Sequence, residues 1–407
     1  MTEPLEVATT AVTGPRTFPF SAPVGLAIDP VFAELRENEP VSRIRLPHGG
    51  DAWLLTRYAD NRALLTDRRF SRAAAAGPAV PRLTVEPAGG SALSMMDGAG
   101  HARLRRLVAP AFSVRRIERL RPRIDRLTDD LLTAMLETGP PAELLEAFAL
   151  PLPITVIWEL LGVPQGNRDH FTGLASRLLS STAYTRDQVQ DAVDELSDYL
   201  ADVIAERRAD PGDDLLSELV HARDVDDRLS ELELVTLCGT LLGAGYENVA
   251  NAIANFTVLL TEDPSLMARL RAQPELVPNA VEEMLRYAMS GLGVSAPRVA
   301  TEDVEIAGVL IRRGEAVFAS LPSANHDPNA FADPDRIDFD RRATGHLAFG
   351  HGAHLCLGAV LARVELRVAL AAVVSRIPGL RLAVPLDEVP WKLGLTVRGP
   401  RALPVTW

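Results

Sequence analysis

One short segment of this sequence groups several chemically capable side chains. The segment HLAFGHGAHLCLGAVLAR, residues 346–363, contains His346, His351 and His354 together with Cys356. Its glycines disfavour a helix, whereas the apolar residues that follow recur at helical spacing. Cys356 is therefore predicted to lie where a loop turns into a helix, and backbone N–H groups and the helix dipole there favour its thiolate.

Three uses of this cysteine have to be weighed. A free cysteine is often only a small buried apolar residue, and this is our interpretation of Cys238, the other cysteine of the chain. A structural zinc site has about four ligands, commonly several thiolates, and no second cysteine lies near Cys356. A haem iron needs one protein ligand on its proximal side, and glycines let the macrocycle approach the backbone.

The pattern Phe349-x-x-Gly352-x-His354-x-Cys356-x-Gly358 resembles the haem-thiolate signature of the cytochrome P-450 superfamily. Further motifs follow in the family's order across nearly the whole chain. The resemblance implies a mainly α, prism-shaped fold with a small β lobe, built around haem b. It implies that Cys356 is the axial iron ligand, that Phe349 and Gly358 belong to the haem-binding segment, and that His354 faces a haem propionate.

Two more motifs gain meaning from the resemblance. His101 and Arg105 are four residues apart, which places them on one helix face. The resemblance implies that both bind haem propionates, as does Arg298. Glu283 and Arg286, three residues apart, would alone be a weak surface pair. The resemblance implies instead a buried network with Arg336 as its third member, which fixes the fold and the haem loop.

A long helix is predicted to begin at Ser230, which forms a capping-box pattern with Glu233, and to continue towards Pro264. Its centre reads GTLLGAGYENVANAIAN, and helical glycines cost roughly 1 kcal/mol each relative to alanine. Close helix packing would explain Gly243 and Gly245. The resemblance implies instead a motif beside the dioxygen site, matched by Ala244, Gly245 and the acidic Glu247.

Asn248 departs from the family pattern, which usually has threonine at this position. The threonine hydroxyl is assigned to proton relay towards dioxygen, whereas an asparagine amide donates hydrogen bonds but relays protons poorly. We hypothesise that Asn248 positions water or substrate, with Glu247 as the acidic gate for protons.

The substrate pocket and the redox partners are expected from the family alone. The pocket candidates are mostly small or apolar and suit a neutral, bulky molecule. They are the loop at about 73–93, Thr240, Gly243, Leu292, Val294, Thr396 and Val397. A ferredoxin and its reductase are expected as electron donors, docked on an arginine patch of Arg103, Arg106 and Arg363.

The elements that must position these residues are mostly helical between about residues 113 and 270. Strand-like text is confined to smaller patches. VSRIRL and AWLLTR are expected to form a hairpin around PHGGD, and VEIAGVLIRRGEAVFAS and WKLGLTVRG also alternate. We expect residues 1–20 to be a mobile leader and residues 21–407 to form one domain.

Composition limits the broad class of protein. The chain has 407 residues and a formal net charge of −12, which argues against general nucleic-acid binding. No signal peptide and no membrane span is expected. Two cysteines far apart in sequence suit a reducing, cytoplasmic compartment.

The resemblance therefore predicts a soluble monooxygenase that uses O₂ and two electrons to hydroxylate or epoxidise a bulky, mostly apolar molecule. Secondary-metabolite biosynthesis, with a macrolide or another polyketide as substrate, is the leading expectation. Asn248 motivates an alternative, oxidative C–C or C–N coupling on an aromatic or peptide scaffold. A non-catalytic haem sensor is the alternative from another class.

Overall fold

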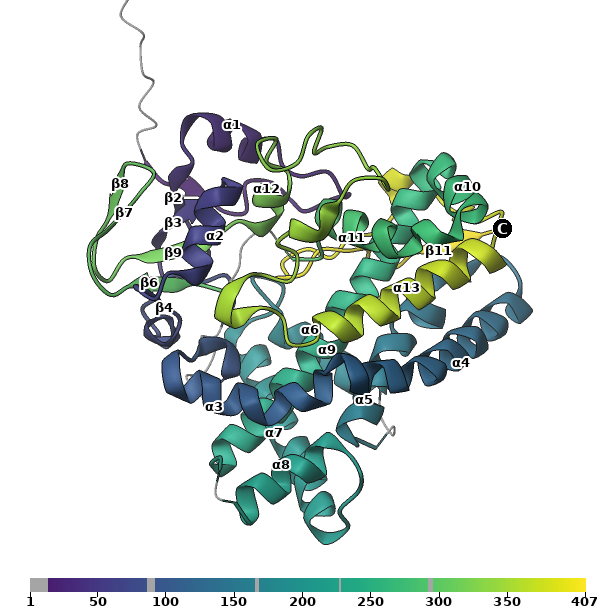
Figure 1. The fold of residues 1–407 in the computed structure, drawn as a ribbon, viewed down its shortest axis with the longest axis horizontal. Coiled ribbons are helices and arrows are strands. Elements are labelled where there is room, and N and C mark those ends of the chain that lie inside the picture. Colours follow the sequence, from purple (N-terminus) through teal and green to yellow (C-terminus); the bar gives the residue numbers. More distant parts are fainter. Residues whose placement is uncertain (1–13, 86–91, 165–167, 227, 292–295) are drawn as a thin grey trace, which may run out of the picture.

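The computed structural model describes residues 14–85, 92–164, 168–226, 228–291 and 296–407, with the backbone alone at 168–170. Helices make up most of the body (Figure 1). They are α1 (Val31–Asn38), α2 (Tyr58–Thr66), α3 (Gly98–Val108), α4 (Val114–Thr138), α5 (Pro151–Leu161), α6 (Arg168–Leu178), α7 (Arg186–Ala209), α8 (Leu215–Asp224), α9 (Glu231–Glu262), α10 (Pro264–Ala272), α11 (Val277–Tyr287), α12 (Leu321–Asn325) and α13 (Ala359–Arg376).

The strands are short and gather mainly at one side of the molecule (Figure 1). A six-stranded sheet has the order β1-β2-β3-β9-β6-β4, and β10-β11-β5 and β7-β8 form smaller sheets. The strands are β1 (Arg16–Thr17), β2 (Val41–Arg45), β3 (Asp51–Leu55), β4 (Phe70–Ser71), β5 (Ala142–Glu143), β6 (Arg298–Ala300), β7 (Val304–Ile306), β8 (Val309–Ile311), β9 (Ala316–Ala319), β10 (Arg381–Leu382) and β11 (Pro404–Thr406). The predicted mainly α fold with a small β lobe is confirmed.

Two of the three strand predictions are confirmed. The first hairpin is β2 paired antiparallel with β3, with Val41 opposite Leu55. The second region forms the β7–β8 hairpin and then β9, which joins the large sheet beside β3. The third prediction is wrong, because among the described residues WKLGLTVRG makes only isolated bridges, which join Trp391 to Pro400, Leu395 to Ser180 and Val397 to Gly291.

The boundary of the leader also needs correction. β1 pairs in parallel with β2, and Phe18 is only 2% exposed in an apolar cluster of the β lobe. Residues 14–20 therefore belong to the folded unit, because burial of aromatic side chains fixes the chain there. Residues 1–13 lie outside the described part of the chain.

The long helix is α9, and it begins as predicted. The Ser230 hydroxyl accepts from the Glu233 backbone N–H, and the Glu233 carboxylate accepts from the Ser230 backbone N–H. The helix packs against α5, α7 and α13, which buries most of its apolar residues. α13 in turn lies beside α4 (Figure 1). Among the described residues, no helix is long and apolar enough to cross a membrane.

Candidate active site

A cavity of about 420 Å³ lies between α9 and the segment that precedes α13. Several predicted site residues line it together. On the α13 side these are Phe349, His354, Cys356 and Gly358, on α3 they are His101 and Arg105, and on α9 they are Thr240, Ala244, Gly245 and Asn248. The fold therefore brings residues from three distant parts of the sequence to one chamber.

Cys356 lies in a tight loop three residues before α13 begins. Its backbone N–H donates to the Phe349 carbonyl oxygen at 2.8 Å. Gly352 has φ +73°, and a Cβ there would stand 2.8 Å from the Leu65 carbonyl oxygen, so the loop requires glycine at this position. Burial raises the pKa of the Cys356 thiol, whereas the Gly358 backbone N–H and the Arg105 charge lower it.

Four cationic or potentially cationic side chains form a second group: Arg72, His101, Arg298 and His354. The His101 and His354 rings are 4.3 Å apart. His101 Nε2 and both terminal nitrogens of Arg298 are buried and have no hydrogen-bond partner within the described structure. Buried polar atoms of folded proteins normally have partners, so these atoms indicate a missing acceptor.

The electrostatics of this group support the same interpretation. Burial and the nearby charge of Arg72 together lower the pKa of Arg298 to about 9. Burial and the charge of Arg72 also lower the pKa of His354 to about 3. These surroundings disfavour the charged forms of both side chains. A bound anion would favour the charged forms and raise both pKa values again.

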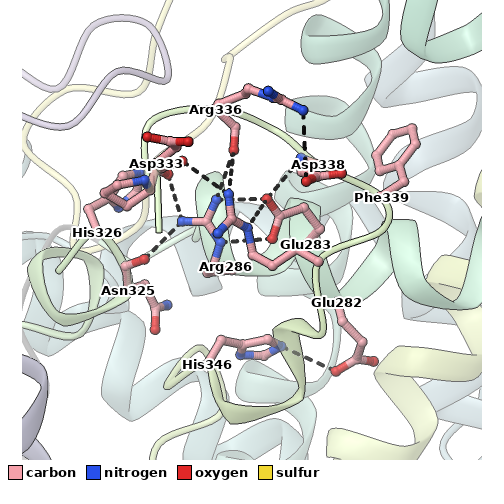
Figure 2. Close-up of polar contacts among 12 residues, drawn as sticks. Glu282, Glu283, Arg286, Asn325, His326, Asp333, Arg336, Asp338, Phe339 and His346 are labelled. Carbon is pink, nitrogen blue, oxygen red and sulfur yellow. Dashed lines mark hydrogen bonds and ion pairs between the residues drawn. The ribbon is translucent and has the colours of Figure 1, made fainter. Parts of the chain in front are cut away.

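The Glu283 network is buried as expected, but its third member was predicted wrongly (Figure 2). Glu283 and Arg286 are fully buried and joined by two hydrogen bonds of 2.8 Å. Arg341, rather than Arg336, donates from Nε to Glu283 at 3.0 Å. The Arg336 side chain is 72% exposed, and only its carbonyl oxygen accepts, from Arg286 and Arg341.

Two glycines of α9 have different surroundings. A Cβ on Gly245 would stand 2.6 Å from the Ile157 side chain of α5, so this glycine allows the two helices to pack closely. A Cβ on Gly243 would meet nothing within 4 Å. The packing explanation therefore holds for Gly245, which also lines the cavity, and does not hold for Gly243.

Glu247 belongs to a buried polar cluster beside the cavity. Lys392, the only lysine of the chain, donates from Nζ to Glu247 at 2.5 Å and to the Asn251 side-chain oxygen at 2.8 Å. The Asn251 amide also donates to Glu247, at 3.3 Å. Glu247 is 5% exposed, and it does not line the cavity itself. Glu247, the residue directly before Asn248 in α9, is thus held in an ion pair with Lys392.

Asn248 faces the cavity and pairs with another polar side chain there. The Ser290 hydroxyl lies 3.2 Å from its side-chain oxygen, and both residues line the chamber. A hydroxyl is therefore present beside the position at which the family usually has one, although it comes from the segment after α11.

The substrate-pocket predictions have mixed outcomes. Thr240 lines the cavity, whereas Gly243, Thr396 and Val397 do not. Thr396 is instead held against the end of α6, because its backbone N–H donates to the Leu179 carbonyl oxygen at 2.8 Å. Leu292 and Val294 lie outside the described residues. At the edge of the expected 73–93 loop, Arg72, Leu93 and Ser94 line the chamber.

The proposed arginine patch is only partly available. Arg103 is paired with Glu233, and Arg106 is exposed. Arg363 is not a free surface cation, because it donates to Glu282 from Nε at 2.7 Å and from Nη2 at 2.8 Å. Its guanidinium also lies 4.4 Å from the centre of the Phe349 ring.

Sequence reasoning missed several buried charged residues at the site. Glu365 on α13 is fully buried and lines the cavity, and neither of its carboxylate oxygens has a partner within the described structure. Burial raises its pKa well above the ordinary value. Arg72, Arg341 and Lys392 were also missed. For Arg341 and Lys392 the signal in the sequence is a charge within loop text, and its partner is visible only in three dimensions.

Comparison with known proteins agrees with these features. The family described as cytochrome P-450 matches residues 172–378. Nocardicin C N-oxygenase of Nocardia uniformis subsp. tsuyamanensis is 49% identical, over 97% of this chain and 99% of the relative. Mycinamicin IV hydroxylase/epoxidase of Micromonospora griseorubida is 48% identical over the same shares. The chain belongs to the cytochrome P-450 family.

The fold comparison supports the same assignment. The crystal structure of cytochrome P-450mel 107F1, described as having biaryl coupling reactivity, superposes with a TM-score of 0.92 at 42% identity. The alignment covers 97% of this chain and all of that one. The protein is thus a cytochrome P-450 monooxygenase, and the P-450 family uses haem with a cysteine thiolate ligand and molecular oxygen.

The residues present fit such a cofactor. Haem carries two carboxylates, and the unpartnered nitrogens of His101 and Arg298 offer donors of the required charge. Cys356 lines the same cavity from the loop that precedes α13. Among the described residues, no three His, Cys, Asp or Glu side chains are grouped to hold a metal ion, so a cofactor with a single protein ligand suits the site better than zinc.

Proposed function

We propose that this P-450 hydroxylates or epoxidises a bulky, mostly apolar secondary metabolite, with Cys356 as the axial ligand of haem b. When bound, the haem supplies activation of dioxygen by two electrons and insertion of one oxygen atom. The observation that carries this proposal is the convergence of Cys356, the unpartnered cationic group and Asn248 on one chamber. The known activities of the two antibiotic-pathway relatives support the same reaction class.

The residues around the chamber have different proposed roles. Arg72, His101, Arg298 and His354 would hold the propionates, because the first three are buried, His354 is partly buried, and the region lacks enough anions. Ala244 and Gly245 leave room over the reacting face. These side chains bind and orient the cofactor and keep bulk water out.

Protons have to reach the chamber without the threonine hydroxyl that the family usually has at the position of Asn248. Glu247 would be the acidic group next to Asn248, where Lys392 donates a hydrogen bond to it. The Ser290 hydroxyl, which can both donate and accept, would pass a proton that the Asn248 amide cannot relay. Asn248 would then orient the water or substrate group that completes this route.

The substrate is proposed to be a macrolide or another polyketide, because the chamber is lined mainly by apolar residues and one relative acts on mycinamicin IV. A second candidate reaction is oxidative C–C or C–N coupling. It is favoured by Asn248 and by the biaryl coupling reactivity described for P-450mel 107F1. A small ferredoxin with its reductase is the proposed electron donor.

Two measurements test the proposal. The reduced protein with CO should show the red-shifted Soret band of thiolate-ligated haem, and Cys356→His should lose that band while still binding haem. A turnover assay with a ligand that shifts iron to high spin then separates the reactions by product mass. Oxygen insertion adds one oxygen atom, coupling only removes hydrogen, and a sensor consumes no O₂. A wild-type protein without the thiolate band would contradict the proposal.

A further inference from the structure

Glu282 is a buried carboxylate that the Glu283 network does not use. It precedes Glu283 on α11 but points to the opposite side, towards His346 (Figure 2). It accepts two hydrogen bonds from Arg363, at 2.7 and 2.8 Å, and one contact from His346 at 3.2 Å. Arg367 lies 3.6 Å away. One carboxylate therefore faces two arginines and a histidine.

The contacts of Glu282 lead directly to the cysteine loop. Arg363 lies over the Phe349 ring, and the Phe349 carbonyl oxygen accepts from the Cys356 backbone N–H. His346 Nδ1 accepts from the Ala348 backbone N–H at 3.1 Å, so a neutral His346 carries its proton on Nε2 and donates to Glu282. Both ends of the loop segment 346–349 are thus tied to one side chain.

The charge of this cluster lies beside the cysteine loop, because the Arg363 guanidinium lies 4.4 Å from the centre of the Phe349 ring. Burial alone would raise the pKa of Glu282, but hydrogen bonds from His346 and Arg363 hold it at about 2. Glu282 is therefore ionised at neutral pH and offsets part of the positive charge next to the cysteine.

We propose that Glu282 is a positioning residue for the cysteine loop, which holds Arg363 against Phe349 and limits the positive charge that the Cys356 thiolate experiences. The inference rests on the proposed haem ligation by Cys356. It assigns to Glu282 a control over the reduction potential of the bound iron, which is separate from the structural task of Glu283.

The decisive measurement is the midpoint potential of the holoenzyme, followed by spectroelectrochemistry. Glu282→Gln keeps the shape of the side chain and removes its charge. Uncovering the arginine favours the reduced state, so the potential should shift to a more positive value. One unbalanced charge at a partly screened site corresponds to about tenfold in the reduction equilibrium, or about 59 mV for one electron.

A charge-compensating double variant separates this role from simple loop support. Glu282→Gln with Arg363→Gln removes one negative and one positive charge, so the potential should return close to the wild-type value. A purely structural role would instead make the double variant at least as disturbed as the single one. Glu315→Gln is the matched control, because it removes a carboxylate paired with Arg43 and Trp53 in the β lobe, and it should leave the potential unchanged.

The outcomes are distinguishable. An unchanged potential in Glu282→Gln, or a shift that persists in the double variant, overturns the inference and leaves the proposed function intact. A wild-type protein without the thiolate band overturns both. If Glu282→Gln does not fold, Arg363→Gln should lower the potential more than Arg367→Gln, since Arg363 lies over the Phe349 ring. Equal shifts in these two variants would also contradict the inference.

Discussion

The two sides of the cavity differ in how they treat buried charge. On the α11 side, Glu283 accepts from Arg286, Arg341 and the Asp338 backbone N–H, so its oxygens are well satisfied. On the side of α3 and β6, nitrogens of His101 and Arg298 have no partner within the described structure. The completed network holds the fold together without a ligand, whereas the incomplete group is arranged for an anion that arrives from outside.

The largest expected effect comes from breaking the completed network. Arg341→Met removes one partner of a fully buried carboxylate, and loss of such a partner costs about 3–5 kcal/mol of unfolding free energy. Arg336→Met should change stability by less than about 0.5 kcal/mol, because that side chain is exposed. Urea unfolding of the two variants checks the assignment, and a larger loss in Arg336→Met would restore the original prediction.

The contrast between Arg341 and Arg336 shows how far sequence reasoning reaches. The fold, the cysteine loop and the start of α9 follow from motifs and periodicity, because local spacing determines them. Which arginine reaches Glu283 depends on the path of an irregular loop, and spacing does not record that path. Lys392 and Glu247 are 145 positions apart, so their ion pair appears only once the chain is folded.

The second prediction concerns how the stability of the region around the Glu283 network depends on pH. His326 is buried near Arg286, Tyr287, Arg36 and Asp335, and burial lowers its pKa from 6.5 to about 4. The unfolded chain therefore binds more protons between these values. The stability contributed by neutral His326 is present above pH 6.5 and is lost as the pH falls towards 4, by about 3 kcal/mol.

His326→Gln keeps a donor for the Pro322 carbonyl oxygen but cannot titrate. Its unfolding free energy should fall less steeply between pH 6.5 and 4 than that of the wild type. The difference between the two curves removes the contribution of all other titrating groups. Parallel curves would show that His326 accepts its proton in the folded state.

The third prediction tests the group with unpartnered nitrogens, because one substitution should have opposite effects without and with haem. Arg298→Met replaces an unpartnered buried cation by an apolar side chain, so it should stabilise the haem-free protein by about 1–3 kcal/mol. In the haem-loaded protein the same change removes a propionate partner and should weaken haem retention. Thermal unfolding of both forms, with haem transfer to an acceptor protein, measures the two effects. A loss of stability in both forms would mean that Arg298 has a partner without haem.

The smallest effect on stability is expected at Asn248, which lines the cavity between the two regions compared above. Its side chain faces the cavity and its contact with Ser290 is 3.2 Å long, so Asn248→Ala should change unfolding free energy by less than about 0.5 kcal/mol. Coupling of electrons to product should nevertheless fall, because the group that orients water or substrate is lost. Asn248→Thr restores a hydroxyl and should recover coupling even when Ser290 is replaced by alanine. If Asn248→Ala leaves turnover, product and coupling unchanged, Asn248 only lines the chamber, and the proton route has to be sought through Glu247 alone.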